Sequence, residues 1–376
     1  MQYRKFGNTG TKISALGFGC MRFPEFEKDG VWYIDEEKTI PMLRSAYERG
    51  VNYFDTAFHY NHDNSPITLG KAFKDIREKV YLTNKIPLFD ENFKTGDYRR
   101  LLEICLKRMD TDYIDFNHFW GINKDYFDNK IIKLDLLNEA VKAKEEGLIR
   151  HISFSFHDKP ENLKYIIDKG EMFETVLLQY NLLDRSNEDA IDYAAQKGLG
   201  VVAMGPVAGG RLAAPARLYK EVSGKQSTAT YELALRFVLG NKNISCALSG
   251  MENMDNLNKN IEVVENESPL TQDEIKKISI AMEDMKKFSD LYCTGCNYCQ
   301  PCPAKINIPS IFNFYTFHNV YGLSQTAKND FIWYKQDSKN ATISSCTDCG
   351  VCEQKCPQKI KIRSELKRVE EILNNL

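Results

Sequence analysis

The sequence predicts an α/β fold: a (β/α)8 TIM barrel followed by a smaller, mainly helical domain. Three observations predict it. Eight short apolar runs alternate with amphipathic segments, the series is uninterrupted, and eight of the 11 cysteines lie between residues 293 and 356. Strands that are covered on both faces read as continuous apolar runs. Eight strand–helix units in one series fit a closed barrel better than an open sheet.

The predicted strands are short and rich in β-branched or aromatic residues. They span residues 13–20, 52–57, 80–86, 113–120, 151–156, 175–181, 200–206 and 245–251. Amphipathic helical patterns lie between them, for example at 35–50 and 134–150. Residues 2–14, with turn residues at 8–10, predict a hairpin before the barrel. No G-x-G-x-x-G follows a strand, which argues against an open dinucleotide-binding sheet.

The chain divides into two predicted domains, residues 1–268 and 269–376. Thr271 and Glu274 form a capping-box pattern, which opens a helix that runs to about Leu291. The cysteine-rich region follows directly. Its carboxyl-terminal segment is an amphipathic helical pattern, which we expect to dock onto this second domain.

Composition places the protein among ordinary globular chains. Hydrophobic residues make up 43% and charged residues 27%. The net charge of -2 provides no general basic surface for nucleic acid. No apolar run approaches the about 20 residues of a membrane span, and the amino terminus lacks the apolar core of a secretory signal. We therefore expect a cytoplasmic protein that binds neither nucleic acid nor membranes.

Eight cysteines form two runs that suit iron–sulfur clusters. The first run, C-x2-C-x2-C-x2-C, contains Cys293, Cys296, Cys299 and Cys302. The second run, C-x2-C-x2-C-x3-C, contains Cys346, Cys349, Cys352 and Cys356. In the bacterial ferredoxin pattern, which the second run matches, the fourth cysteine ligates the other cluster. The sequence therefore predicts two [4Fe–4S] clusters, each held by the first three cysteines of one run and the fourth cysteine of the other. Cys356 would complete the cluster of the first run, and Cys302 would complete that of the second. Two zinc sites are the alternative.

Charged and hydroxyl side chains gather where the second and third predicted strands end. Asp55 ends the second strand, Tyr60 follows five residues later, and Lys85 ends the third. Active sites of such barrels lie at the carboxyl ends of the strands. A buried lysine needs an anionic partner, for which Asp55 is the nearest candidate. We expect the ammonium to lower the pKa of Tyr60 and make it a proton donor.

The chain from Tyr3 to about Glu265 resembles the aldo/keto reductases. The resemblance rests on YRKFGNTGTKISALGFG, FDTAFHY with LGKAF, LTNKIP, GLIRHISFSF, LLQYN and GPVAGGRL. With its tail, the whole chain is similar to the branch of that family that carries a carboxyl-terminal dicluster ferredoxin-type domain. The resemblance implies hydride exchange between a nicotinamide cofactor and a carbonyl or alcohol substrate. Tyr60 would be the general acid, and Lys85 and Asp55 would tune it.

The resemblance also implies a histidine at the end of the fourth strand, where the sequence departs from the family pattern. Counting D-x-x-x-x-H from Asp115 gives Trp120, and His118 lies two residues earlier. Residues two apart in a strand share a face. His118 is therefore expected to complete the catalytic tetrad from deeper in the barrel, and a packed structural histidine is the alternative.

A nicotinamide site is implied in the same way. The positions that would contact the cofactor are Arg22, Ser155, Gln179, Gly205, Gly250, Asn256 and Asn260. Gly250 and Asn256 stand where members of the family that prefer NADPH often carry Lys and Arg, so we expect no NADPH preference. A flavin phosphate in the loop 206–212 is the alternative cofactor.

The two domains favour different electron chemistry. A nicotinamide exchanges two electrons as a hydride, whereas a cluster normally accepts one. We expect an oxidoreductase that passes electrons through its clusters, with a redox protein as a possible partner. The alternatives are a carbonyl reductase with structural clusters, an electron carrier with a non-catalytic barrel, and a redox sensor.

Overall fold

The computed structural model of the chain describes residues 1–182, 184–207, 230–266, 270–287, 291, 293, 299–319, 322–337, 340–356 and 359–376. These residues divide into two compact units, and the second contains the chain from Leu270 onward. The domain boundary predicted at residues 268–269 lies outside the described residues, and the domain limits stay a prediction. Within the described residues, no helix combines the length and apolarity that a membrane crossing requires.

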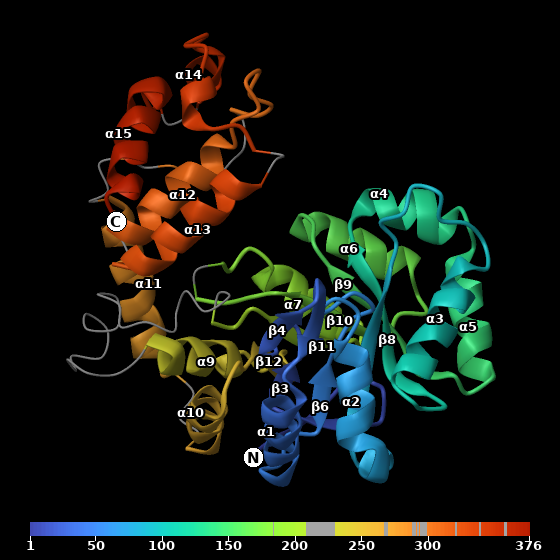
Figure 1. Cartoon of the computed structure of the whole chain (residues 1–376). Coiled ribbons are helices and arrows are strands. Elements are labelled where there is room, and N and C mark those ends of the chain that lie inside the picture. Colours follow the sequence, from blue (N-terminus) through green and yellow to red (C-terminus); the bar gives the residue numbers. More distant parts are fainter. Residues whose placement is uncertain are drawn as a thin grey trace. The chain divides into compact units, whose positions relative to one another are not determined.

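Eight parallel strands close into a barrel in the first unit (Figure 1). They are β3 (Leu16–Gly19), β6 (Tyr53–Asp55), β7 (Tyr81–Pro87), β8 (Ile114–Ile122), β9 (Ile149–Phe156), β10 (Thr175–Gln179), β11 (Gly200–Met204) and β12 (Cys246–Gly250). Each strand overlaps one of the eight predicted ranges, so the predicted barrel is confirmed. Neighbours in the ring are neighbours in the chain, and β3 closes the ring between β12 and β6.

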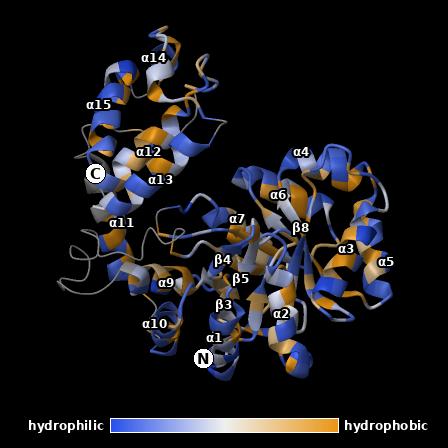
Figure 2. Cartoon of the chain, in the orientation of Figure 1, coloured by the Kyte–Doolittle hydropathy of each residue, from blue (hydrophilic) through white to orange (hydrophobic). Residues whose placement is uncertain are grey.

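Amphipathic helices surround the barrel. The longer ones are α1 (Glu36–Glu48), α2 (Ser65–Phe73), α3 (Asp97–Arg108), α5 (Leu136–Glu145), α6 (Pro160–Lys169), α7 (Glu188–Gln196), α9 (Thr230–Gly240) and α10 (Met254–Glu265). Short turns of helix lie at η1 (Lys74–Lys79), α4 (Lys124–Tyr126) and η2 (Phe127–Ile132). These helices carry both hydrophobic and hydrophilic residues (Figure 2), and α6 buries Leu163, Ile166 and Ile167. Burial of such apolar stripes stabilises the barrel.

The amino-terminal hairpin supplies the core at the start of the strands. β1 (Tyr3–Lys5) and β2 (Lys12–Ser14) pair antiparallel, as predicted. Phe6, in the turn between them, is buried against Tyr53 and Phe116, with ring centroids 5.8 and 4.8 Å away. A Cβ on Gly200 would lie 2.2 Å from the Phe6 ring, so only glycine fits there. Aromatic packing therefore fills this end of the barrel and leaves the carboxyl ends of the strands for chemistry.

A second hairpin, which our sequence analysis missed, follows β3. β4 (Glu25–Lys28) and β5 (Val31–Ile34) pair antiparallel. Asp29 and Gly30 at the turn have φ of 53° and 78°. Two consecutive positive φ values match the Asp-Gly turn that favours tight hairpins. The Asp29-Gly30 dipeptide is the sequence feature from which this hairpin could have been predicted.

The second unit is mainly helical, as predicted. It contains α11 (Gln272–Lys287), α12 (Ile308–Asn319), α13 (Ser324–Gln336), η4 (Ile343–Ser345), α14 (Val351–Lys355) and α15 (Ile362–Asn374). α12 packs against α13 and α15, and α15 buries Leu366 and Val369. The predicted docking of the last helix is thus confirmed. The capping box is also present, because the Thr271 N–H donates to Glu274 Oε2 (2.8 Å) and the Glu274 N–H donates to Thr271 Oγ1 (3.1 Å).

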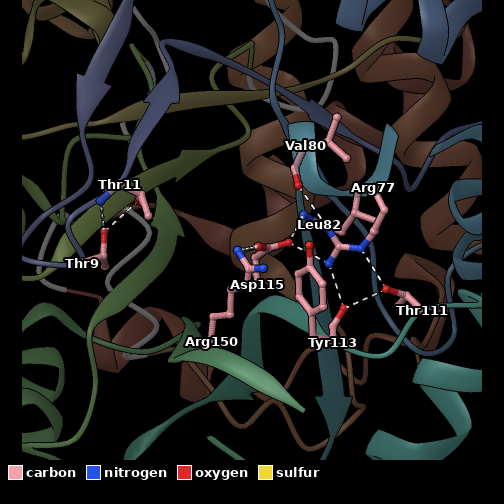
Figure 3. A network of polar contacts seen from close by, with 9 residues as sticks. All are labelled: Thr9, Thr11, Arg77, Val80, Leu82, Thr111, Tyr113, Asp115 and Arg150. Carbon is pink, nitrogen blue, oxygen red and sulfur yellow. Dashed lines mark hydrogen bonds and ion pairs between the residues drawn. The ribbon is translucent and has the colours of Figure 1, made fainter. Parts of the chain in front are cut away.

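A buried carboxylate joins β7, β8 and β9 near their amino ends (Figure 3). Asp115 Oδ2 accepts from Arg77 Nη2 (2.8 Å) and the Leu82 N–H (3.0 Å), and Arg150 lies 3.5 Å from Oδ1. The two guanidinium groups lie 4.0 and 3.9 Å from the centre of the Tyr113 ring. Arg77 also donates to carbonyls in this region, so one carboxylate organises the junction of three strands.

We predict that Asp115→Ala lowers the free energy of unfolding by about 3–5 kcal/mol. Removing one member of a buried ion pair leaves the Arg77 charge without its carboxylate partner, and the Leu82 N–H loses its acceptor. Urea unfolding of the full chain, followed by circular dichroism, measures this loss. Asp112→Ala, at an exposed position in the same segment, is the control and should change stability by less than about 0.5 kcal/mol. Equal effects of the two substitutions would contradict the prediction.

Candidate functional site

Asp55 and Lys85 form a buried ion pair at the carboxyl ends of β6 and β7. Lys85 Nζ donates to Asp55 Oδ1 and to the carbonyl of Thr56 (2.7 Å), and Thr83 Oγ1 donates to Asp55 Oδ2 (2.5 Å). Both side chains belong to residues that are 1% exposed. Strand register produces this arrangement, because Asp55 pairs with Thr83 and Lys85 lies two residues further on the same face.

The contacts of Lys85 keep its amine charged. Burial alone favours the neutral amine, but Asp55 and the neighbouring Tyr60 more than compensate, so the pKa of Lys85 is raised. A charged amine in an enclosed site acts strongly on its neighbours because little water screens it. The barrel therefore holds a fixed positive charge beside Tyr60.

Tyr60 lies beside this charge, in the loop that follows β6. The Lys85 ammonium is 4.7 Å from the centre of the Tyr60 ring. Burial raises the pKa of Tyr60, and the Lys85 charge offsets only part of that rise. Our expectation of a lowered pKa was wrong, because removing a phenolate from water costs more than an ammonium already paired with Asp55 returns. Tyr60 is therefore a neutral phenol at pH 7, the form that donates a proton.

His118 and Trp120 occupy different places along β8. His118 pairs in register with Lys85 and is fully buried. Within the described residues, neither imidazole nitrogen has a hydrogen-bond partner of good geometry. Trp120 instead reaches the Tyr60 ring, with ring centroids 5.5 Å apart and planes at 90°. The aromatic residue thus contacts the phenol, and the histidine lies beside the lysine.

The pKa of His118 follows from this enclosure. Burial lowers it to about 4; Asp55 opposes the decrease and the Lys85 charge adds to it. The imidazole is consequently neutral at physiological pH. A neutral ring next to an ammonium can contact it without adding a second positive charge.

Aromatic rings form one wall near Tyr60. Trp120 contacts Phe89 edge to face, with centroids 5.0 Å apart, and lies 6.3 Å from the His59 ring. Phe89 is 46% exposed although it is a large apolar side chain. The sequence analysis missed Phe89, because a single aromatic residue in a loop carries no recognisable signal.

Three of the predicted cofactor residues lie at the ends of β9, β10 and β11. The Ser155 hydroxyl accepts from the Gly121 N–H (2.8 Å) and is buried. Gly205 has a φ of 61°, and a Cβ there would lie 2.9 Å from Gln179 Oε1. Gly205 therefore leaves space for the Gln179 amide, which lies at the carboxyl end of the barrel. Residues 208–212 of the loop considered for a flavin lie outside the described residues.

The other four gather where β12 meets α10. A Cβ on Gly250 would lie 3.7 Å from Arg22 Cδ, so this glycine and this arginine are neighbours. Asn260 Nδ2 donates to Ser249 Oγ (3.0 Å). Asn256 lies in the first turn of α10, whose amino end attracts anions. All seven predicted cofactor residues thus occupy the barrel end that carries Asp55 and Lys85.

Cysteines from both runs meet in the second unit. One pocket is lined by four of them: Cys302, Cys346, Cys349 and Cys352. Cys356 is buried, Cys293 and Cys299 are partly exposed, and Cys296 lies outside the described residues. Among described residues, no three His, Cys, Asp or Glu side chains are close enough to share one ion. The four cysteines of this pocket provide thiols, the donors that iron–sulfur clusters take.

We predict that the barrel loses stability between pH 6.5 and about 4. An unfolded histidine binds a proton near 6.5, whereas folded His118 does so only near 4. The unfolded chain then holds more protons in this window, so stability falls as the pH falls. The loss amounts to about 3 kcal/mol. His118→Asn should remove this component of the pH dependence and the exposed His59→Asn should not. Identical profiles for wild type and His118→Asn in urea unfolding would refute this.

Comparison with known proteins identifies both parts of the chain. The model of the aldo/keto reductase family matches residues 15–283, and that of the 4Fe-4S dicluster domain matches residues 292–360. L-galactose dehydrogenase of Arabidopsis thaliana is 27% identical over 77% of this chain and 97% of its own length. The uncharacterized oxidoreductase YqkF of Bacillus subtilis is 26% identical over 74% of this chain and 95% of its own.

Solved structures agree with these matches. The holo form of an aldo-keto reductase from Bacillus halodurans superposes with a TM-score of 0.64 at 26% identity, over 74% of this chain and 96% of that one. The chain belongs to the aldo/keto reductase family of oxidoreductases and carries a 4Fe-4S dicluster domain after its barrel.

Proposed function

We propose that the barrel exchanges hydride between a nicotinamide cofactor and a small carbonyl or alcohol substrate, with Tyr60 as the proton donor. The observation that supports this most strongly is the enclosed Lys85–Asp55 pair beside a phenol that stays protonated. Bound nicotinamide supplies the hydride. The chain must then deliver one proton to the carbonyl oxygen, and Tyr60 is the group placed to do so.

Each member of the site has a separate task. As negative charge develops on the substrate oxygen, the Tyr60 hydroxyl transfers its proton there, and a phenolate remains. Lys85, 4.7 Å from the ring centre, stabilises that phenolate. Asp55 keeps the ammonium charged and aligned through the hydrogen bond that Lys85 donates. In alcohol oxidation the same contacts favour the phenolate as the proton acceptor.

His118 and Trp120 support these groups. His118, neutral and paired in register with Lys85, restricts where the ammonium can lie. Trp120 packs at right angles against the Tyr60 ring and would restrict its orientation. We assign His118 a positioning role in the tetrad; its strand register with Lys85 and its neutral ring support this assignment.

Two groups of residues would bind different parts of the nicotinamide dinucleotide. Ser155 and Gln179 would hold the carboxamide, and Gly205 gives the Gln179 amide its space. Arg22, Asn256 and the amino end of α10 favour the phosphates, while Asn260 would contact the adenine. Since Gly250 and Asn256 are uncharged, a 2′-phosphate gains no dedicated cation from them, and we propose that NADH binds as well as NADPH.

The second unit would hold two [4Fe–4S] clusters with exchanged ligands. Supporting this, Cys302 of the first run lines the same pocket as Cys346, Cys349 and Cys352. The second cluster would then take Cys293, Cys296, Cys299 and Cys356. Two clusters that accept one electron each can together store the two electrons of one hydride. We propose that they pass these electrons singly to a redox partner.

We predict that Tyr60→Phe lowers kcat for carbonyl reduction by about 10²–10⁴, the usual contribution of a general acid. The affinity for NADH and NADPH should stay within about twofold, because the ring remains and only the hydroxyl group is lost. Anaerobic assays with a panel of aliphatic and aromatic aldehydes and ketones measure the rate. Tyr126→Phe, in α4, is the control. Full activity of Tyr60→Phe, or no turnover of any carbonyl by wild type, would reject the proposed reaction.

If each cluster takes its fourth cysteine from the other run, cysteine substitutions should remove iron in a specific pattern. The variant Cys349→Ser with Cys352→Ser should lower iron from about eight to about four atoms per chain, because one of two clusters is lost. Adding Cys302→Ser should then change nothing further, since Cys302 serves the lost cluster. Adding Cys356→Ser instead should remove iron from the remaining one. The opposite pattern in iron analysis and EPR would show that each run holds its own cluster.

A further inference from the structure

The loop that carries Tyr60 has an unusual backbone. Asn61, His62 and Asp63 have φ of 52°, 53° and 71°, so three consecutive residues that are not glycine adopt the left-handed conformation. Such residues rarely adopt it, although Asn, Asp and His tolerate it better than others. Strained backbone of this kind persists only where the surroundings hold it, and it concentrates at functional sites. Side chains from neighbouring elements hold residues 61–63 in this conformation.

Arg108, the last residue of α3, binds both sides of this loop. Its Nη1 donates to the carbonyl of Phe58 (2.9 Å), two residues before Tyr60, and its Nη2 donates to Asp63 Oδ2 (2.7 Å), three residues after it. The guanidinium also lies 4.3 Å from the centre of the Phe58 ring. The Arg108 side chain is only 22% exposed. One planar group thus fixes the separation between the two flanks of Tyr60.

Further contacts hold the same short segment. Asp63 Oδ1 lies 2.8 Å from His59 Nδ1, so the Asp63 carboxylate is engaged at both oxygens. On the other side, Trp32 of β5 stacks on His62, with ring centroids 5.4 Å apart. The Trp32 carbonyl accepts from Asn64 Nδ2 (3.0 Å). The β4–β5 hairpin and α3 therefore hold the loop together.

We propose that Arg108 is a positioning residue for Tyr60. By joining Phe58 and Asp63 it maintains the left-handed run and keeps the phenol at its distance from Lys85. This inference rests on the proposed function, because it concerns the rate at which Tyr60 delivers its proton. Arg108 needs no contact with substrate or cofactor for this role. An arginine suits it better than a lysine because its fork of donors reaches two acceptors at once.

Arg108→Ala should lower kcat by about 100-fold, the effect that a displacement of about 1 Å can have at a reacting centre. The KM of the carbonyl substrate and the Kd of NADH should change less than about twofold. Amide hydrogen exchange, measured by mass spectrometry, should become faster in peptides that cover residues 58–64. Arg100→Ala removes an exposed arginine from the same helix and should alter none of these quantities.

Substitution by glycine separates positioning from general stability. Glycine adopts the left-handed conformation without a steric penalty. Asn61→Gly in the Arg108→Ala background should therefore recover about tenfold in kcat, whereas a fold weakened elsewhere would not respond to it. Arg108→Lys keeps the charge but reaches one acceptor at a time, and it should fall between wild type and Arg108→Ala. It also provides a second variant if Arg108→Ala does not fold.

The outcomes distinguish this inference from the proposed function. The positioning role is overturned if Tyr60→Phe abolishes turnover while Arg108→Ala matches wild type in kcat and in amide hydrogen exchange at residues 58–64. A loss of kcat that Asn61→Gly does not recover, with unchanged exchange at residues 58–64, overturns it equally. If wild type reduces no carbonyl, the proposed function fails. Faster exchange at residues 58–64 in Arg108→Ala would then still support the contacts of Arg108, and unchanged exchange would refute them.

Discussion

The buried ion pair between Lys85 and Asp55 is the interaction on which the site depends. A buried lysine stays charged only when other groups replace its hydration. Here the Asp55 carboxylate balances the charge, and the Thr56 carbonyl accepts a further hydrogen bond. Parallel pairing of β6 with β7 places the two groups on one face of neighbouring strands. The same pairing brings Thr83 to the second oxygen of Asp55. The barrel therefore fixes a positive charge 4.7 Å from the centre of the Tyr60 ring, where our proposed function requires it.

The two ends of the barrel have separate tasks. Near the amino ends of the strands, Phe6 fills the core. Asp115 of β8 there binds the Leu82 N–H of β7 and the Arg150 side chain of β9. These contacts are extensive and rigid, as a scaffold requires. At the carboxyl ends, loops carry the polar groups, and even the strained segment after Tyr60 is held by identifiable partners. The scaffold contacts thus belong to the strands, while the phenol that we propose as the proton donor lies in a loop that Arg108 and Trp32 hold.

Sequence patterns predicted the scaffold more completely than the site. Apolar runs located all eight barrel strands. The cysteine spacing predicted crossed ligation, which stays a prediction, and the structure places Cys302 in one pocket with Cys346, Cys349 and Cys352. The pKa of Tyr60 was predicted in the wrong direction, because the sequence shows which charges are near but not how much water is removed. The left-handed backbone of residues 61–63 was likewise beyond prediction. Asn, His and Asp permit that conformation, but two of the residues that hold the segment, Arg108 and Trp32, are distant in sequence.

A nicotinamide delivers two electrons together and a cluster accepts one, so the proposed function combines two kinds of redox chemistry in one chain. An anaerobic titration of the purified protein with NADH and NADPH, followed by visible absorption and EPR, tests whether these are connected. Our account predicts that the cluster absorption bleaches and that EPR signals of reduced clusters appear. If neither cofactor changes the spectra while dithionite reduces the clusters, the barrel does not supply electrons to the clusters, and the account is contradicted.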